Sequence, residues 1–335
     1  MKHLTNKQRL AVLVPILLTL ICALAYFCMT IGYVEIPFDR FIATLQGKGT
    51  SQEQIVIWQF RMPKTAVAII AGICLTASGA VMQGVTRNPI ATPSLLGISS
   101  GSGLGTLLVV YALDIGMGLV IPQPVAAVLG GLATFAIVYG LALRYKMSPI
   151  KLILNGIAIN SCIGSISLII TLKLSSNGYT MLSLINAGSL SYATWDMIKF
   201  AYITAIPLFA YVIYKACFLN ILNLDDEMAV GLGLNLVKER KKLLIVTVLL
   251  TSISSYVAGG IGSIGMISPH IAKRIVGSNF KLFLPLATLI GVTIILVADV
   301  TVRILALNGM QFQIGTLISL IGSPYLLYLL FTEDR

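Results

Sequence analysis

The chain has 335 residues, of which 57% are hydrophobic and only 10% are charged. A water-soluble globular domain carries about 25% charged residues, so this composition excludes an ordinary soluble protein and indicates an integral membrane protein. The net charge of +11 does not indicate a nucleic-acid partner, because the basic residues are scattered between apolar segments, as in the cytoplasmic loops of membrane proteins.

The apolar segments predict an all-α membrane protein, because a membrane span needs about 20 mostly apolar residues. We predict ten transmembrane helices, at residues 10–32, 64–84, 94–112, 119–143, 150–172, 197–217, 241–258, 266–277, 281–304 and 314–332. The first is long enough to span and lacks a small-residue cleavage site, so we expect it to be retained. The eighth is too short to cross alone and follows a glycine-rich stretch, which predicts a broken or tilted segment covered by protein or by a water-lined cavity.

The distribution of basic residues predicts the orientation. With a cytoplasmic N-terminus, the inner segments hold 16 Lys and Arg residues and the outer segments hold 7. Cytoplasmic loops carry the excess of Lys and Arg, so we expect both termini in the cytoplasm. The longest outer segments, 33–63 and 173–196, are expected to cap the bundle, and residues 1–335 are interpreted as a single transmembrane domain.

Residues 222–242 carry eight charged residues between two apolar segments. Asp225, Asp226 and Glu227 stand where a helix would begin, and carboxylates are favoured at the positive end of a helix dipole. The glycines that follow predict two short helices around a hinge, the second beginning near Leu234. A solvated loop and a docking element for a soluble partner both fit this pattern.

Several polar side chains interrupt the apolar segments. Gln83, Asn155 and Asn160 lie within predicted spans, where an amide must either find a partner on another helix or face a water-filled path. Asp299 and Arg303 are spaced i, i+4, which allows an ion pair that lowers the cost of placing charge in a membrane.

Two further groups of polar residues lie at the predicted span ends. Arg87-Asn88-Pro89 predicts a tight cytoplasmic turn. Arg61 and Lys64 lie at the outer end of the second span and would form a cationic rim with Arg303. Such a rim suits an acidic partner, with attraction that weakens in salt.

The sequence shows no catalytic constellation. Gly47-Lys48 lacks the upstream glycine of a phosphate-binding loop. The five cysteines and two histidines have no metal-ligand or disulfide spacing. Asp299 is the one acidic residue placed within a predicted span, which argues against a carrier built on carboxylate proton relays. Uphill transport would therefore need energy from another chain.

The run from Arg61 to Gly103 closely resembles the second-to-third-span signature of FecCD-type permeases, the membrane subunits of bacterial ATP-binding-cassette (ABC) importers for iron–siderophores, haem and cobalamin. Further stretches agree in order and spacing: 152–160, 186–195, 224–235, 259–277, 298–305 and 321–330. The resemblance covers nearly the whole chain. It implies a type II ABC importer permease bundle that dimerises around a central pathway, with a soluble ATPase dimer below and a substrate-binding protein above.

The resemblance also implies roles for individual residues. The element that couples to the ATPase would comprise Leu224, Asp225, Asp226, Glu227, Met228, Ala229, Gly231, Leu232 and Gly233. Docking of the binding protein would use Arg61, Lys64 and Arg303. The expected gate and pathway residues are Arg87, Asn88, Pro89, Ser148, Asn155 and Asn160. We expect no catalytic residue, metal or cofactor on this chain, since ATP would be used by the partner subunit.

One departure stands out. Where the family usually carries a Glu-aliphatic-Pro stretch before the last span, this chain has Gln311-Phe312-Gln313. One hypothesis is that the chain is half of a heterodimer whose partner keeps the usual residues. The expected function is import of a ferric siderophore across the bacterial cytoplasmic membrane, with haem or cobalamin as alternative cargo. A secondary carrier without an ATPase, or a scaffold without transport, fits the motifs less well.

Overall fold

The computed structural model describes residues 5–117, 121–143, 149–222, 226–231 and 235–333. These residues form helices joined by turns and short loops, and the described part contains no strand. The helices are α1 (Asn6–Thr30), α2 (Phe38–Leu45), α3 (Ser51–Ile55), the π-helix η1 (Val56–Arg61), α4 (Met62–Thr86), the 3₁₀ helix η2 (Pro93–Leu96), α5 (Ile98–Asp114), α6 (Gln123–Leu143), α7 (Pro149–Thr171), α8 (Ser176–Asn186), α9 (Trp195–Tyr214), α10 (Ala216–Leu222), α11 (Asp226–Gly231), α12 (Leu236–Ala258), α13 (Ile264–Val276), α14 (Phe280–Leu307) and α15 (Ile314–Glu333).

Each of the ten predicted spans coincides with a helix, namely α1, α4, α5, α6, α7, α9, α12, α13, α14 and α15. Within the described residues, seven helices are long and apolar enough to cross a membrane. Two shorter apolar helices are α5 itself and the part of α15 from Ile314 to Leu329. The protein is thus a multi-pass, all-helical membrane protein, and the number of helices that cross the bilayer remains a prediction.

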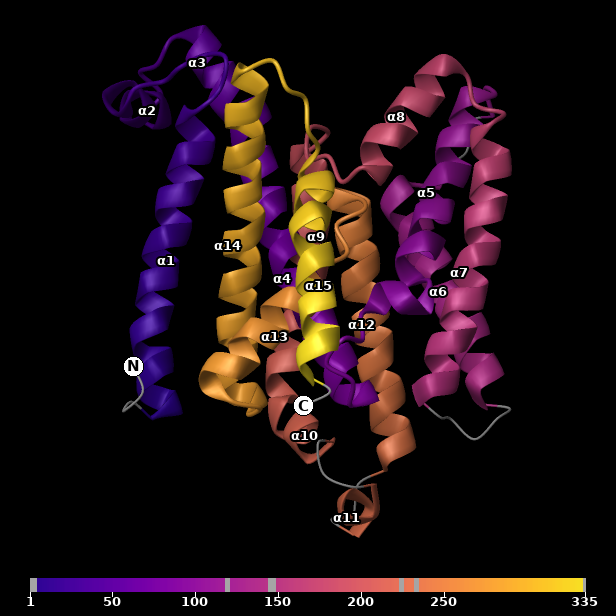
Figure 1. Ribbon diagram of the computed structural model, residues 1–335. Helices are drawn as coiled ribbons and strands as arrows, with labels where there is room; N and C mark the ends of the chain where they lie inside the picture. Colours follow the sequence, from indigo (N-terminus) through magenta and orange to yellow (C-terminus); the bar gives the residue numbers. More distant parts are fainter. Residues whose placement is uncertain (1–4, 118–120, 144–148, 223–225, 232–234, 334–335) are drawn as a thin grey trace.

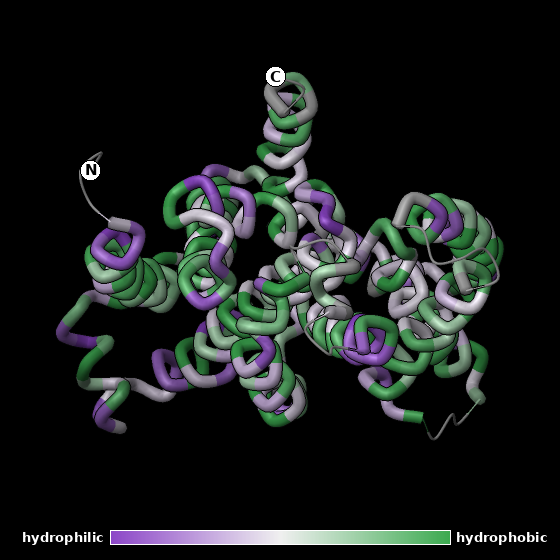
Figure 2. Tube along the Cα trace, turned by 90° about the horizontal axis from the view of Figure 1, so that it is seen from below, coloured by the Kyte–Doolittle hydropathy of each residue, from purple (hydrophilic) through white to green (hydrophobic). Residues whose placement is uncertain are grey.

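The bundle has two distinct ends. Figure 1 shows both termini, α10 and α11 at one end, called here the α11 end, and α2, α3 and α8 at the opposite end, called the α2 end. Seen from the α11 end, the helices are mostly hydrophobic along their lengths, and hydrophilic residues gather at several of their ends (Figure 2). This pattern suits helices that lie in lipid and end in water.

α4 lies at the centre of the bundle, against α9, α12, α13 and α14. Small residues bring these helices together. A Cβ atom added at Gly79 would stand 1.8 Å from the carbonyl oxygen of Gly265 on α13, and one at Gly101 on α5 would stand 2.6 Å from that of Gly130 on α6. The expectation that small residues allow close helix packing in lipid is therefore confirmed.

The break before α13 is also confirmed. Residues 259–263 are not helical, and α13 has only 13 residues. Gly259 has a φ of 63°, and a Cβ atom there would stand 1.9 Å from the Ile185 carbonyl oxygen. The Gly260 amide donates to the same carbonyl at 3.4 Å, and the Gly315 amide donates to the Gly188 carbonyl at 3.2 Å. Protein contacts therefore hold this irregular backbone, and Gly259 and Gly260 also line a cavity of about 310 Å³. Both settings are ones in which non-helical backbone is tolerated at membrane depth.

The structure corrects one element and extends another. The second short helix expected near Leu234 is instead the first part of α12, which runs unbroken from Leu236 to Ala258. Asn235 caps it by accepting a hydrogen bond from the Lys238 amide at 3.0 Å, and no glycine or proline then interrupts helix propagation.

In the segment 33–63, α3 and η1 continue directly into α4, which gives one helix of 36 residues, Ser51–Thr86.

Candidate functional site

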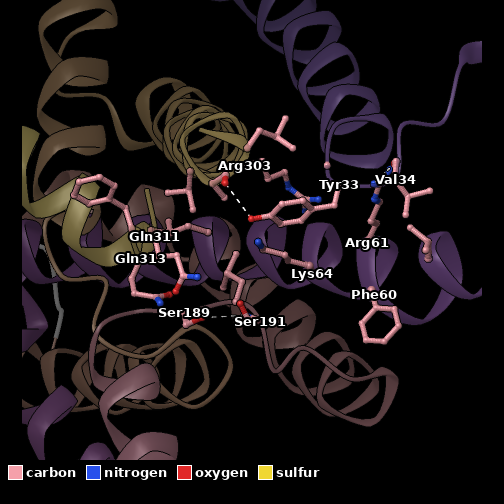
Figure 3. Close-up of a pocket in the computed structure, with 18 residues that line it drawn as sticks. Tyr33, Val34, Phe60, Arg61, Lys64, Ser189, Ser191, Arg303, Gln311 and Gln313 are labelled. Carbon is pink, nitrogen blue, oxygen red and sulfur yellow. Dashed lines mark hydrogen bonds between the residues drawn. The ribbon is translucent and has the colours of Figure 1, made fainter. Parts of the chain in front are cut away.

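A pocket of about 490 Å³ opens at the α2 end. Arg61 and Lys64 reach it from the same long helix and Arg303 reaches it from α14, while Ser189, Ser191, Gln311 and Gln313 line the other sides (Figure 3). The three cations of the predicted rim therefore line one pocket. Its remaining lining residues are Gly32, Tyr33, Val34, Val56, Phe60, Leu190, Val302, Ala306, Leu307, Phe312 and Ile314.

A buried carboxylate lies beneath two of the cations. Asp299 is 0% exposed, and one of its oxygens lies 2.9 Å from Lys64 Nζ. Its other oxygen lies 2.9 Å from both Nε and Nη2 of Arg303. The predicted Asp299–Arg303 ion pair is confirmed, and Lys64 joins it from α4, so the cluster fastens α4 to α14.

Arg61 is held differently. It is 6% exposed, and its guanidinium donates to the carbonyl oxygens of Met29 at 2.7 Å, Thr30 at 3.0 Å and Val34 at 2.5 Å. Five donors in a planar fork allow arginine to gather several acceptors in this way. Arg61 therefore ties the end of α1 to the start of α4, and its charge acts on the pocket from below the surface.

The pocket keeps a positive balance. Its lining holds three cations and, among these described residues, no carboxylate. Asp299 beneath it neutralises one of them, which leaves two positive charges in excess. Gln311 and Gln313 occupy the side where an acidic residue was expected from the family resemblance, so this departure makes the pocket more positive.

The α11 end holds the predicted coupling element. α11 begins at Asp226, inside the acidic cluster as predicted, and ends at Gly231. Met228 is 59% exposed and Ala229 is buried. Leu224, Asp225, Leu232 and Gly233 lie outside the described residues, as does Ser148, and so do the side chains of Asp226 and Glu227.

Arg87-Asn88-Pro89 forms the expected tight turn after α4. Arg87 has a φ of 52°, and it is the one non-glycine residue with a positive φ in the described part of the chain. Its Nε donates to the Leu222 carbonyl oxygen at 2.8 Å. The Asn88 side chain accepts from the Ile90 amide at 3.0 Å. The turn thus also contacts the last residue of α10, which the sequence did not indicate.

The amides within the spans divide between two situations. Gln83 Nε2 donates to the Met266 carbonyl oxygen at 3.4 Å, and the Asn160 side chain accepts from Ser100. These contacts join helices, which favours the structural alternative for both residues. The Asn155 Nδ2 is buried without a hydrogen-bond partner among the described residues. A pathway role for Asn155 and Asn160 remains a prediction.

One polar cluster at the α11 end was missed by the sequence analysis. Glu239 on α12 lies 2.7 Å from the Nζ atoms of both Lys215 and Lys242. The hydrogen bond to Glu239 raises the pKa of Lys215 above its ordinary value, and the same bond lowers the pKa of Glu239. This link is therefore present at neutral pH, and it is lost as the pH rises above the ordinary pKa of lysine or falls below that of glutamate. The i, i+3 spacing of Glu239 and Lys242 was a local signal, whereas Lys215 is 24 residues away.

Comparison with known proteins now adds to this geometry. The model of the FecCD transport family matches residues 17–332. The chain belongs to the FecCD transport family. This family consists of the membrane permease subunits of ABC transporters, which have no ATPase site of their own and rely on a separate subunit for hydrolysis. Membership implies an ATPase, a substrate-binding protein and a second permease as partners.

Individual relatives match over almost their whole length. The Fe(3+)-citrate import system permease protein YfmE of Bacillus subtilis is 35% identical, covering 100% of this chain and 99% of the relative. The iron(3+)-hydroxamate import system permease protein FhuG of the same organism is 32% identical, with 98% and 99% covered. The hemin transport system permease protein HmuU of Yersinia pestis is 33% identical, with 95% and 94% covered.

A solved structure has the same fold. It shows an inward-facing conformation assigned to a metal-chelate type ABC transporter, and it superimposes with a TM-score of 0.79 at 25% identity, covering 94% of this FecCD chain and 97% of the other. The helical arrangement of Figure 1 is therefore that of an ABC transporter permease.

Proposed function

We propose that this FecCD permease carries a ferric siderophore across the bacterial cytoplasmic membrane as part of an ABC importer. The full-length match to permeases named for iron(3+)-hydroxamate and Fe(3+)-citrate import carries the proposal. Haem is the second candidate cargo, because HmuU matches over a similar length. Cobalamin, the third cargo of the resembling family, stays as an alternative.

The proposed orientation places the α11 end in the cytoplasm and the α2 end outside, with ten helices crossing the bilayer. The excess of Lys and Arg in the segments assigned to the inside supports it. The ATPase would then dock at Leu224–Gly233 and the binding protein at the cationic pocket. A second permease, which we expect to be a different chain, would complete the pathway.

No cofactor is assigned to this chain, because ATP would be bound and used by the partner. Closure of the ATPase dimer would push on α11 and change the balance between outward and inward opening. Such coupling requires contacts that differ between the two states.

Replacing Asp226 and Glu227 with Lys should abolish this coupling while the protein still inserts into the membrane. The rate of substrate-stimulated ATP hydrolysis by the assembled complex measures the effect, and hydrolysis at the parent rate would contradict the proposed coupling element.

The cationic pocket is proposed to attract acidic side chains of the binding protein. Two excess positive charges at the pocket support this role, and such attraction speeds association most at low salt. Since Arg61 is buried, we expect it to act through its field, with Lys64 and Arg303 nearer the partner.

Arg303→Gln tests the pocket without leaving Asp299 unpaired, because Lys64 remains 2.9 Å from it. We expect weaker docking of the binding protein at low salt and a smaller salt dependence than in the parent. Lys199→Gln is the matched control, since Lys199 lies outside the pocket and its side chain is 71% exposed. Equal docking of the parent and Arg303→Gln complexes at low salt would remove the pocket from the proposed function.

The importer itself is tested by reconstituting the chain with its partner permease, ATPase and binding protein in liposomes. Uptake of radiolabelled iron would be compared with ferric hydroxamate, ferric citrate and haem as cargo. We expect uptake that requires ATP and the binding protein. Uptake without the ATPase would instead favour a secondary carrier.

A further inference from the structure

α10 is a helix of seven residues at the α11 end, placed between α9 and α11. One face is buried: Leu219 and Leu222 are 0% exposed and Ala216 is 2% exposed. This face packs on α4 and α14. A Cβ atom at Gly84 of α4 would stand 2.6 Å from Phe280 of α14 and 3.5 Å from Leu219, so the three helices meet closely there.

Asn220 adds a polar connection from α10 to α14. Its Oδ1 accepts from the Phe280 amide at 2.7 Å, and its Nδ2 donates to Asn279 Oδ1 at 3.0 Å. Asn279 in turn caps α14 by accepting from the Lys281 amide at 3.1 Å. The first amides of a helix lack partners within it, so Asn220 completes the start of α14 from another helix.

Two more connections leave the ends of α10. At its last residue, the Leu222 carbonyl accepts from Arg87, the residue that ends α4 in a left-handed conformation. Immediately before its first residue, Lys215 pairs with Glu239 at the start of α12 at 2.7 Å. α10 and the residue before it are thus connected by polar contacts to the end of α4, the start of α12 and the start of α14.

We propose that α10, with Asn220 as its main positioning residue, transmits movement of the coupling element to α4, α12 and α14. This inference rests on the proposed function, because it assumes that the ATPase acts on α11. α11 follows α10 after three residues, and both lie at the same end of the bundle (Figure 1). α11 lies against both α10 and α12. A displacement of α11 therefore reaches α10 directly, and the polar contacts of α10 and Lys215 then pass it to α4, α12 and α14.

The experiment uses the assembled complex in lipid nanodiscs and needs no knowledge of the cargo. Ser191→Cys places a reporter thiol at the pocket of the α2 end. The rate at which a maleimide labels this thiol, with and without ATP, measures its accessibility. Mass spectrometry reads the labelling at position 191 separately from that of the native cysteines. In the Asn220→Ala complex we expect ATP hydrolysis to continue, while the ATP-dependent change in labelling falls by roughly fivefold or more, which is the low end of the coupling typically found between two sites.

Asn308→Ala is the matched control. Asn308 lies beyond the other end of α14, and its Nδ2 donates within that helix to the Ile304 carbonyl at 3.2 Å. We expect this variant to behave as the parent does. If Asn220→Ala does not assemble, Asn220→Asp keeps the acceptor for the Phe280 amide but loses the donor to Asn279, and it should show a reduced response.

The outcomes separate the two proposals. An ATP response of parent size in an assembled Asn220 variant would overturn the role of α10 and leave the proposed function intact. No ATP response in the parent complex would contradict the proposed function, and this inference with it.

Discussion

At the residue scale, Asp299 decides how charge is accommodated at the α2 end. A carboxylate buried among helices is stable only if cations pair with it closely. Lys64 and Arg303 supply that pairing from two different helices. The same contacts hold both cations at the wall of the pocket, so one acidic residue both stabilises the helix packing and positions the charges of the pocket.

Asp299→Asn should therefore destabilise the protein strongly. It would leave Lys64 and Arg303, whose side chains are 18% and 10% exposed, without their anion. Breaking a buried ion pair in this way lowers the free energy of unfolding by about 3–5 kcal/mol. Thermal unfolding in detergent measures the effect. Asp196→Asn is the control, because its pair with Lys199 is exposed and such pairs contribute about 0–1 kcal/mol. Similar melting temperatures for both variants would contradict this account.

The sequence predicted part of this cluster. Asp299 and Arg303 are neighbours on one helix face, so their spacing was informative. Lys64 is 235 positions away from Asp299, and no local pattern indicates their contact. Arg61 was expected at the rim, but its burial depends on carbonyl groups at the end of α1, which a sequence pattern does not place. The contacts of Asn220 were missed for the same reason.

At the element scale, close approach of α4 and α13 depends on glycine. Gly79 and Gly265 touch along their backbones, so α13, which has only 13 residues, packs its buried face directly against α4. Hydropathy predicted this segment well because its shortness and its glycines are local features. α2, α3 and α10 were not predicted, because short helices at bundle ends are fixed mainly by contacts with other elements.

Gly79→Ala should force α4 and α13 apart. Overpacking of this kind costs about 1–3 kcal/mol, because the contacting atom is a backbone carbonyl that cannot move aside. Gly140→Ala on α6 is the matched control, since nothing lies within 4 Å of a Cβ atom there, and it should raise stability by about 0.5–1 kcal/mol. Thermal unfolding of both variants checks the sign, and a Gly79→Ala protein as stable as the parent would refute the close contact.

At the scale of the whole molecule, the two ends face different compartments in the proposed orientation. The cationic pocket lies at one end and α10 with α11 at the other. The charge distribution predicts this orientation, because the excess of Lys and Arg is a property of whole loops, and the orientation stays a prediction. Composition and charge distribution could not indicate which surfaces of the bundle face lipid, a second permease or the pathway, since apolar side chains suit all three.

The orientation is tested by labelling intact cells with a maleimide that does not cross membranes. Gln46→Cys, at the end of α2, should react from outside, whereas native Cys217, which is exposed on α10, should react only after the membrane is permeabilised. Mass spectrometry separates the two sites. Reaction of Cys217 in intact cells would contradict the proposed orientation and, with it, docking of the ATPase at the α11 end.

The long helix formed by α3, η1 and α4 has a mechanical consequence. Its 36 residues extend about 54 Å at 1.5 Å per residue, whereas the hydrocarbon core of a bilayer is about 30 Å thick. This helix is therefore long enough to project from the hydrocarbon core on at least one side. A tilt imposed at Arg87, where the helix ends, would also move its other end beside the pocket, across the π-helix η1 and Pro63, the places where a helix bends most readily.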